Sequence, residues 1–146
     1  MKEYRLIPAL LCLMFVPLLA SSQDSEWEQV RRQAESHHEI VALLVRQNNF
    51  RQVLPEMRKI FALRFPEKYE SMLSQEIQVV ADALMHKNQH DLALQVIDEG
   101  LKSLKLDSNK ADVCRKKAHI LKRQGKEDEA LKCFKLSLEL DARKSH

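Results

Sequence analysis

The sequence predicts an all-α protein built from antiparallel helical hairpins. Only two glycines and four prolines occur among its 146 residues, whereas a β-sandwich or barrel needs turn residues about every 8–12 positions. The chain is 45% hydrophobic, 31% charged and 5% aromatic, so it is neither disordered nor membrane-embedded as a whole. Apolar residues recur at helical spacing, and the turns between helices are short, which favours antiparallel neighbours.

Residues 1–22 have the layout of a secretory signal peptide. A basic start precedes an apolar run over residues 6–20, and small residues follow it. Ala20 and Ser22 fit the small positions of a cleavage site, so we expect a cut after Ser22, or after Ala20 as second choice. The mature chain would then begin near Gln23. The apolar run is short for a membrane span, which needs about 20 residues, but an uncleaved anchor is the alternative.

The first helix is predicted over residues 26–47. Ser25 and Glu28 form an S-x-x-E capping box, in which each side chain hydrogen-bonds to a backbone amide of the first turn. Apolar residues then repeat along one side. Asn48 is expected to end the helix, because asparagine tolerates the left-handed backbone conformation that closes one.

Two proline-containing helices are predicted next. The second helix covers residues 51–63, where Pro55 either lies in the first turn, so that the helix begins at Leu54, or kinks the helix. Pro66 is expected in the first turn of a third helix that runs over residues 66–87.

The last three helices are predicted over residues 91–104, 110–124 and 127–141. Gly100 weakens the first of them locally. Residues 107–109 are expected to form a loop with an N-cap at its end, and Gly125 is expected just past the end of the next helix. Residues 23–146 thus form one domain of helical hairpins at about 26–64, 66–105 and 109–142.

The three hairpins share an order of residue types around their turns, which indicates a repeat. The matching positions are Ala118, Leu121, Gly125, Ala130 and Phe134; Ala81, Leu84, Asn88, Ala93 and Ile97; and Val41, Leu44, Asn48, Val53 and Met57. The turn residues lie 40 and then 37 positions apart. Small residues at equal distances from a turn let two antiparallel helices approach closely.

The last hairpin resembles a tetratricopeptide repeat. The order that carries the resemblance is Ala118, Leu121, Gly125, Ala130, Phe134 and Leu138. The sequence departs from the pattern at Cys114, where the family often has Trp, and at Ala142, where Pro is common. Only residues 111–142 match specifically. The resemblance implies a right-handed α-solenoid of about three antiparallel hairpins, a TPR-like superhelix; a generic helical-hairpin solenoid or bundle is the alternative.

The resemblance also implies a concave face, formed by the first helix of each hairpin, that binds a peptide or a partner helix. Carried over to this sequence, the candidate residues are Glu35, His38, Ala42 and Arg46; Gln75, Gln78, Asp82, Met85 and His86; and Arg115, His119, Lys122 and Arg123. Arg115, Lys122 and Arg123 would pair with carboxylates of a partner. The alternative is that these are solvated surface charges.

Charge is distributed unevenly along the predicted mature chain. Residues 23–109 hold 11 Lys and Arg against 14 Asp and Glu, whereas residues 110–146 hold 11 against 6. The basic end could meet acidic peptides or an anionic surface, but a solvated helical face is the favoured explanation.

The last helix carries apolar residues on two sides. We expect Ala130, Phe134 and Leu138 to pack against the preceding helix. Leu136 and Leu140 would then stay exposed in a monomer, which predicts contact with another protein or with a second copy of the chain.

Cys114 and Cys133 lie at nearly equal distances from the turn at Gly125. An exported compartment permits oxidation, so they are candidates for a disulfide.

No pattern of residues indicates catalysis. The sequence has no H-E-x-x-H, C-x-x-C or G-x-S-x-G motif, and the adjacent His37 and His38 point in different directions on a helix. We therefore expect no metal, no cofactor, no nucleic acid and no enzymatic activity.

The sequence predicts an exported, periplasmic or secreted interaction module, an adaptor or assembly factor that binds a protein or peptide. The alternative is a structural helical protein tethered to a membrane by an uncleaved N-terminal segment.

Overall fold

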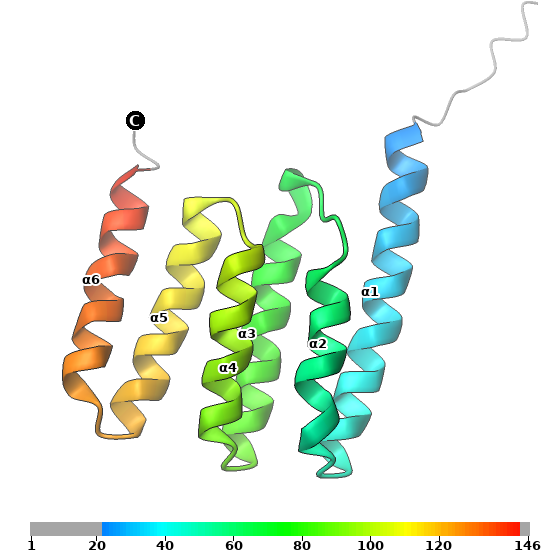
Figure 1. The fold of residues 1–146 in the computed structure, drawn as a ribbon. Coiled ribbons are helices and arrows are strands. Elements are labelled where there is room, and N and C mark those ends of the chain that lie inside the picture. Colours follow the sequence, from blue (N-terminus) through cyan, green and yellow to red (C-terminus); the bar gives the residue numbers. More distant parts are fainter. Residues whose placement is uncertain (1–21, 144–146) are drawn as a thin grey trace, which may run out of the picture.

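The computed structural model describes residues 22–143, and every regular element within that range is helical. The elements are α1 (Ser22–Arg46), η1 (Phe50–Gln52), α2 (Val53–Phe61), η2 (Glu67–Tyr69), α3 (Glu70–His86), α4 (His90–Ser103), α5 (Asp107–Arg123) and α6 (Glu127–Arg143), where η denotes a 3-10 turn. The hairpins α1/α2, α3/α4 and α5/α6 follow one another in a row (Figure 1). The predicted all-α class is therefore confirmed, while residues 1–21 of the predicted signal segment lie outside the described part.

The same turn closes each hairpin. Asn48 and Asn88 have φ of 58° and Gly125 has φ of 75°, so each occupies the left-handed region that ends a helix, as predicted for Asn48 and Gly125. The residue after each of them donates its backbone amide to a carbonyl five positions back. These bonds join Asn49 to Leu44 at 2.8 Å, Gln89 to Leu84 at 2.8 Å and Lys126 to Leu121 at 3.0 Å.

Several predicted helix boundaries are corrected by the structure. α1 begins at Ser22, so Ser25 and Glu28 lie inside the helix, and the predicted capping box does not mark its start. Pro55 lies in the first turn of α2, one of the two predicted placements. There its missing amide costs nothing, because the first-turn amides have no partner within the helix.

The start of α3 differs from the prediction. Pro66 has extended backbone with ψ of 146° and precedes the 3-10 turn η2, so α3 itself begins only at Glu70. Residues 107–109 are not a loop but the first turn of α5.

Small residues lie where paired helices meet. Ala81, Ala93 and Ala118 are fully buried and Ala130 is 3% exposed, which agrees with the predicted close approach. At Gly100 the approach is closer still, because a β-carbon built there would lie 2.6 Å from Cδ1 of Ile77.

A continuous hydrophobic core runs through α1 to α5, and Leu101 connects it to a small cluster of α5 and α6. No helix of the described residues combines the length and the apolar character that a membrane crossing needs.

An aromatic cluster fixes the N-terminal part of α1. Trp27, which is 6% exposed, stacks on Tyr69 with ring centroids 4.0 Å apart and meets Phe65 edge-on at 5.9 Å. Both partners belong to the connection between α2 and α3, so the cluster ties α1 to that connection.

Candidate functional site

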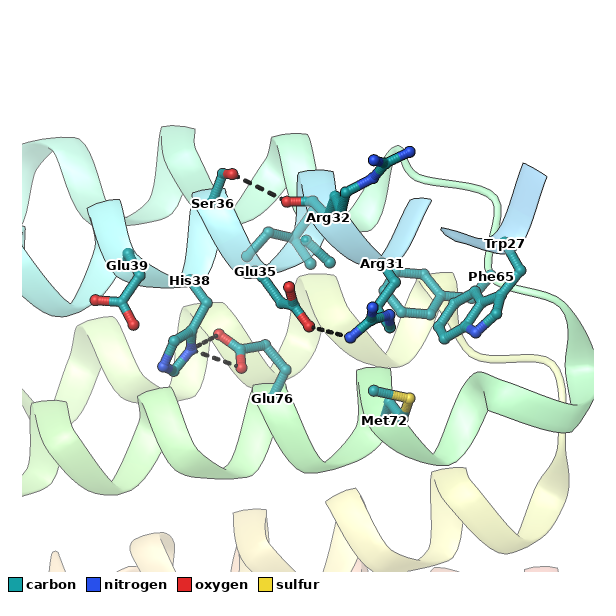
Figure 2. A pocket seen from close by; sticks show the side chains of 12 residues that line it. Trp27, Arg31, Arg32, Glu35, Ser36, His38, Glu39, Phe65, Met72 and Glu76 are labelled. Carbon is teal, nitrogen blue, oxygen red and sulfur yellow. Dashed lines mark hydrogen bonds and ion pairs between the residues drawn. The ribbon is translucent and has the colours of Figure 1, made fainter. Parts of the chain in front are cut away.

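A groove of about 690 Å³ lies along the middle of α1, next to α3 (Figure 2). Its apolar lining consists of Trp27, Ala34, Ile60, Phe65 and Met72. Its polar lining consists of Arg31, Arg32, Glu35, Ser36, His38, Glu39 and Glu76. The groove therefore combines apolar surface with charges of both signs, as binding sites for ligands and peptides generally do.

The apolar surface of the groove is set by tertiary packing. Trp27 and Phe65 are held by the aromatic cluster, whereas Met72 on α3 remains 45% exposed. A methionine side chain is flexible and polarizable, so it adapts to differently shaped apolar partners. Met72 is thus the exposed apolar contact that the groove offers.

The polar rim is organised by hydrogen bonds. Arg31 on α1 donates to Glu28 and to Glu35, each at 2.9 Å. The hydrogen bond with Glu28 and the negative charges of both carboxylates raise the pKa of Arg31 above its ordinary value. Nδ1 of His38 lies 2.8 Å from Oε1 of Glu76, so this pair bridges α1 and α3 across the groove (Figure 2).

The structure brings only part of the sequence-predicted site into this groove. Glu35 and His38 line it, whereas none of Arg46, Gln78, Asp82, His86, Arg115, His119, Lys122 and Arg123 does. Arg46, His86 and Arg123 are the last residues of α1, α3 and α5 and are exposed there.

Several of the predicted residues bind neighbouring groups of the chain itself. Gln78 donates to the backbone carbonyl of Ser74 at 3.3 Å. Asp82 on α3 accepts a hydrogen bond from Nζ of Lys116 on α5 at 2.7 Å. The first contact lies within α3, whereas the second joins the first helices of neighbouring hairpins and pairs the charge of Asp82.

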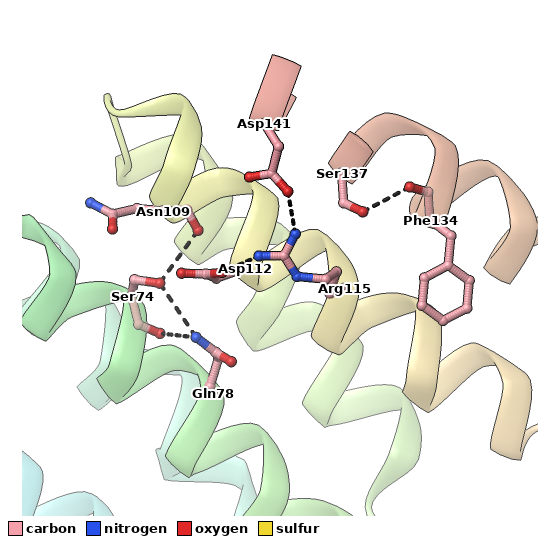
Figure 3. Close-up of polar contacts among 8 residues, drawn as sticks. All are labelled: Ser74, Gln78, Asn109, Asp112, Arg115, Phe134, Ser137 and Asp141. Carbon is pink, nitrogen blue, oxygen red and sulfur yellow. Dashed lines mark hydrogen bonds and ion pairs between the residues drawn. The ribbon is translucent and has the colours of Figure 1, made fainter. Parts of the chain in front are cut away.

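Arg115 is engaged in the same way. Its guanidinium donates to Asp141 at 2.6 Å and also to Asp112 (Figure 3). These hydrogen bonds and charges raise the pKa of Arg115 despite partial burial. Arg115 is therefore bound to α6 and does not present a free charge.

The packing of α6 overturns part of the predicted self-association site. Leu140 is 6% exposed and packs with Ala111 and Cys114, so it is not available to a partner. Leu136 is 43% exposed, in agreement with the prediction for it, but Leu138, expected against α5, is 68% exposed.

Cys114 and Cys133 are both free thiols in the structure, so the disulfide considered from the sequence is not formed in it. Burial raises the pKa of both thiols, and Lys117 partly offsets this effect. In the described part of the chain no group of three or more His, Cys, Asp or Glu side chains is arranged to hold a metal ion.

Sequence reasoning missed Trp27, Arg31, Met72 and Glu76 as groove residues. The one available signal was that Trp27 is the only tryptophan in a chain that is 5% aromatic. The position of Met72 opposite α1 depends on how the hairpins stack, which the local sequence does not specify.

Comparisons with known proteins identified no relative of this chain. No protein-family model matches the chain, and searches of curated proteins and of solved structures find no match either.

Proposed function

We propose that the chain is an exported, non-catalytic protein–protein interaction module that binds a peptide or a partner helix in the groove along α1 and α3. One observation carries the proposal: Met72 is 45% exposed in a groove of about 690 Å³ that is rimmed by ordered charges. Exposed apolar surface surrounded by polar side chains is typical of interaction sites.

The chemistry of the groove indicates the kind of ligand it fits. Arg32 provides positive charge on α1 and Glu39 provides negative charge beside it. Arg31 is already paired with Glu28 and Glu35, and Glu76 with His38. A ligand with one apolar side chain for Met72 and charges of both signs around it would satisfy this lining. An amphipathic helix or a short peptide has that pattern.

The proposal includes the tetratricopeptide-like architecture, in which the hairpins stack as a right-handed solenoid. It is supported by the identical turns at Asn48, Asn88 and Gly125. It is also supported by the buried alanine pairs of α3/α4 and α5/α6. In such stacks the first helices of the hairpins form a common binding face, and the groove lies on the first helices α1 and α3.

Peptide selection followed by calorimetry tests the proposal. A random peptide library is selected against the purified protein, and the dissociation constant of each enriched peptide is measured. Met72→Asp should weaken binding at least about tenfold, equivalent to about 1.4 kcal/mol, because it places a charge on the apolar contact.

Val79→Asp is the matched control. Val79 lies on the same helix and is 46% exposed, close to the 45% of Met72, but it is not part of the groove. This variant should bind as the wild type does, and circular dichroism checks that both variants fold. Failure to enrich any peptide, or equal binding by Met72→Asp, would contradict the proposal.

A further inference from the structure

The last hairpin leaves an apolar face of α6 uncovered. Leu131 is 52% exposed and Leu138 is 68% exposed, and Phe134 lies half-buried between them along the helix. Phe134 meets His119 of α5 edge-on, with ring centroids 5.1 Å apart. Together, Leu131, Phe134, Leu138 and His119 form what we call the tail face.

The same positions are covered in the preceding hairpin. Leu94, Ile97 and Leu101 of α4 lie 37 residues before Leu131, Phe134 and Leu138. Ile97 is fully buried in the core cluster that includes Val113 and Ile120 of α5, and Leu94 and Leu101 pack against it. The structure therefore shows which element fits on such a face, namely a helix placed as α5 is against α3 and α4.

Three polar contacts accompany this covering helix. Lys116 of α5 donates to Asp82 at 2.7 Å, and Lys117 donates to Asp98 at 2.6 Å. The side-chain amide of Gln124 reaches Asp91 at 3.5 Å. The covering helix α5 thus contributes two lysines and one side-chain amide, each of which meets a carboxylate of α3 or α4.

The tail face carries a different set of charges at the corresponding places. The residues 37 positions after the three carboxylates occupy the equivalent places. They are His119 for Asp82, Lys135 for Asp98 and Asp128 for Asp91. Basic side chains thus replace two carboxylates, whereas the third carboxylate is kept. A helix that covers the tail face should bring an acidic or apolar residue where α5 has Lys116 and Lys117, and an amide where it has Gln124.

The outer side of α1 carries such a set. Counting 77 residues back from Lys116, Lys117, Ile120 and Gln124 gives Glu39, Ile40, Leu43 and Gln47. All four are exposed, and the two large apolar side chains, Ile40 and Leu43, are each 41% exposed. We call these four residues the head face.

We propose that two copies of the chain associate head to tail, with α1 of one copy packed on α5 and α6 of the other as α5 packs on α3 and α4. In that register Glu39 lies opposite His119, Ile40 and Leu43 cover Leu131, Phe134 and Leu138, and Gln47 lies opposite Asp128. Arg58 of α2 donates to Glu99 of α4 at 2.6 Å. In the same register the corresponding residues are Lys135, 77 positions after Arg58, and Lys59, 40 positions before Glu99, which form one like-charged pair. Lys59 already donates to Glu56 at 2.7 Å.

This contact uses two different surfaces of the chain, so it is heterologous. Such an interface leaves a free head and a free tail on every assembly and extends until the rotation closes a ring. Glu39 belongs to both the head face and the groove lining, whereas Leu43 and Leu138 lie outside the groove. The variants Leu43→Asp and Leu138→Asp therefore test the association without altering the groove.

Sedimentation velocity with complementing variants tests the proposal. The protein is used as purified from an expression host, with the N-terminus as processed there. The weight-average mass of the wild type should rise with concentration beyond twice the monomer mass. Leu43→Asp and Leu138→Asp should each remain monomeric, because each variant has one damaged face.

A mixture of these two variants gives the sharper result. Leu138→Asp keeps an intact head and Leu43→Asp keeps an intact tail, so the mixture should form 1:1 dimers and grow no further. Leu136→Asp is the control, because Leu136 is 43% exposed on α6 but lies outside the tail face; it should assemble as the wild type does.

Charge reversal provides a second measurement. Glu39→Lys should weaken assembly, and adding His119→Glu to it should restore assembly, which a merely misfolded variant would not do. A wild type that stays monomeric at every concentration overturns the proposal. So does a closed dimer insensitive to Leu43→Asp, which would indicate tail-to-tail pairing, or failure of the mixture to dimerise.

Discussion

Glu70, the first residue of α3, accepts a hydrogen bond from the backbone amide of Leu106, which lies 2.8 Å away at the start of α5. The same carboxylate accepts from the amide of Lys105 at 3.0 Å and from the side chain of Asn109 at 3.1 Å. Glu70 is 2% exposed. A carboxylate from one hairpin therefore caps the first helix of the next, where the helix dipole favours negative charge.

Glu70→Ala should destabilise the protein by about 3 kcal/mol, because each buried donor left unpaired costs about 1–3 kcal/mol. Urea unfolding followed by circular dichroism measures the change. The control is Glu67→Ala, which removes an exposed carboxylate three residues earlier and should change stability by less than about 0.5 kcal/mol. Equal stability of the two variants would contradict the capping role of Glu70.

Gly100→Ala should also destabilise the protein, although alanine is the better helix former by about 1 kcal/mol. The new β-carbon would lie 2.6 Å from Cδ1 and 2.7 Å from Cγ1 of Ile77, which is fully buried. Overpacking of this kind costs about 1–3 kcal/mol, so we expect a net loss of about 1 kcal/mol.

A double-mutant cycle separates this clash from other causes. In the Ile77→Ala background the obstacle is absent, so Gly100→Ala should become stabilising by up to about 1 kcal/mol through helix propensity. The same loss in both backgrounds would show that Ile77 is not the reason for the glycine.

The parts of the fold that local sequence determines were predicted. Asn48, Asn88 and Gly125 end their helices because their own backbone conformation is left-handed. The buried alanines follow from helix geometry, since equal distances from a turn bring two positions together. These features need no knowledge of distant residues.

The parts that depend on distant residues were not predicted. The cap of α5 comes from Glu70, in the preceding hairpin, and the local polar residues 107–109 therefore suggested a loop. On α6, Ser137 and Leu138 lie seven and eight positions after Ala130. Helical spacing alone allows either of them to share the buried face of Ala130. The structure buries Ser137, at 2% exposure, and exposes Leu138, which is why the predicted packing of Leu138 and exposure of Leu140 were wrong.

The groove was predicted even less completely than the fold. The resemblance to tetratricopeptide repeats placed Glu35 and His38 on the binding face, and both do line the groove. The same resemblance also placed Arg115 on the binding face, but its guanidinium donates a hydrogen bond to Asp141 of the last helix. Which charges are free thus depends on contacts between helices.

Acid should weaken the link between α2 and α4. Arg58 donates to Glu99 at 2.6 and 2.7 Å, and this hydrogen bonding lowers the pKa of Glu99 below its ordinary value. A carboxyl group with a lowered folded-state pKa stabilises the fold above its unfolded pKa, and this contribution is lost as the pH falls through the folded pKa. The contribution is small, because the Arg58 side chain is 57% exposed and that of Glu99 is 27% exposed.

Urea unfolding at pH 7 and about pH 3 measures this effect. Glu99→Gln should be less stable than the wild type at pH 7, and the difference should shrink in acid as the carboxyl of Glu99 becomes protonated. Glu139→Gln, an exposed substitution on α6, serves as control. A difference between Glu99→Gln and wild type that does not change with pH would contradict the ion pair.

The two cysteines should react slowly with thiol reagents in the folded state. Burial raises the pKa of Cys114 and of Cys133, so less of the nucleophilic thiolate is present at neutral pH. Cys133 is half-buried and Cys114 is 3% exposed, so Cys133 should react first. Time-resolved labelling followed by peptide mass analysis measures the order, and faster reaction of Cys114 would contradict the packing of α5.

Lys117 provides a variant for the same experiment. Its positive charge lowers the pKa of both thiols and so opposes the effect of burial. Lys117→Met should therefore slow the labelling of Cys133, whereas Lys132→Met, which changes an exposed residue adjacent to Cys133, should slow it less. Equal rates in the two variants would show that Lys117 does not act on the thiol.

The proposed export predicts a defined N-terminus, because signal peptidase would remove the apolar segment by cutting after a small residue. The intact mass of the protein recovered from its native host should therefore correspond to a chain that begins at Gln23, or at Ser21 if the cut follows Ala20. Measured without reductant, the mass also reports on the thiols. The free Cys114 and Cys133 of the structure predict no loss of two hydrogens. A mass that retains residues 1–22 would contradict cleavage and favour a tethered protein, in which the groove and the head face would be presented at a membrane.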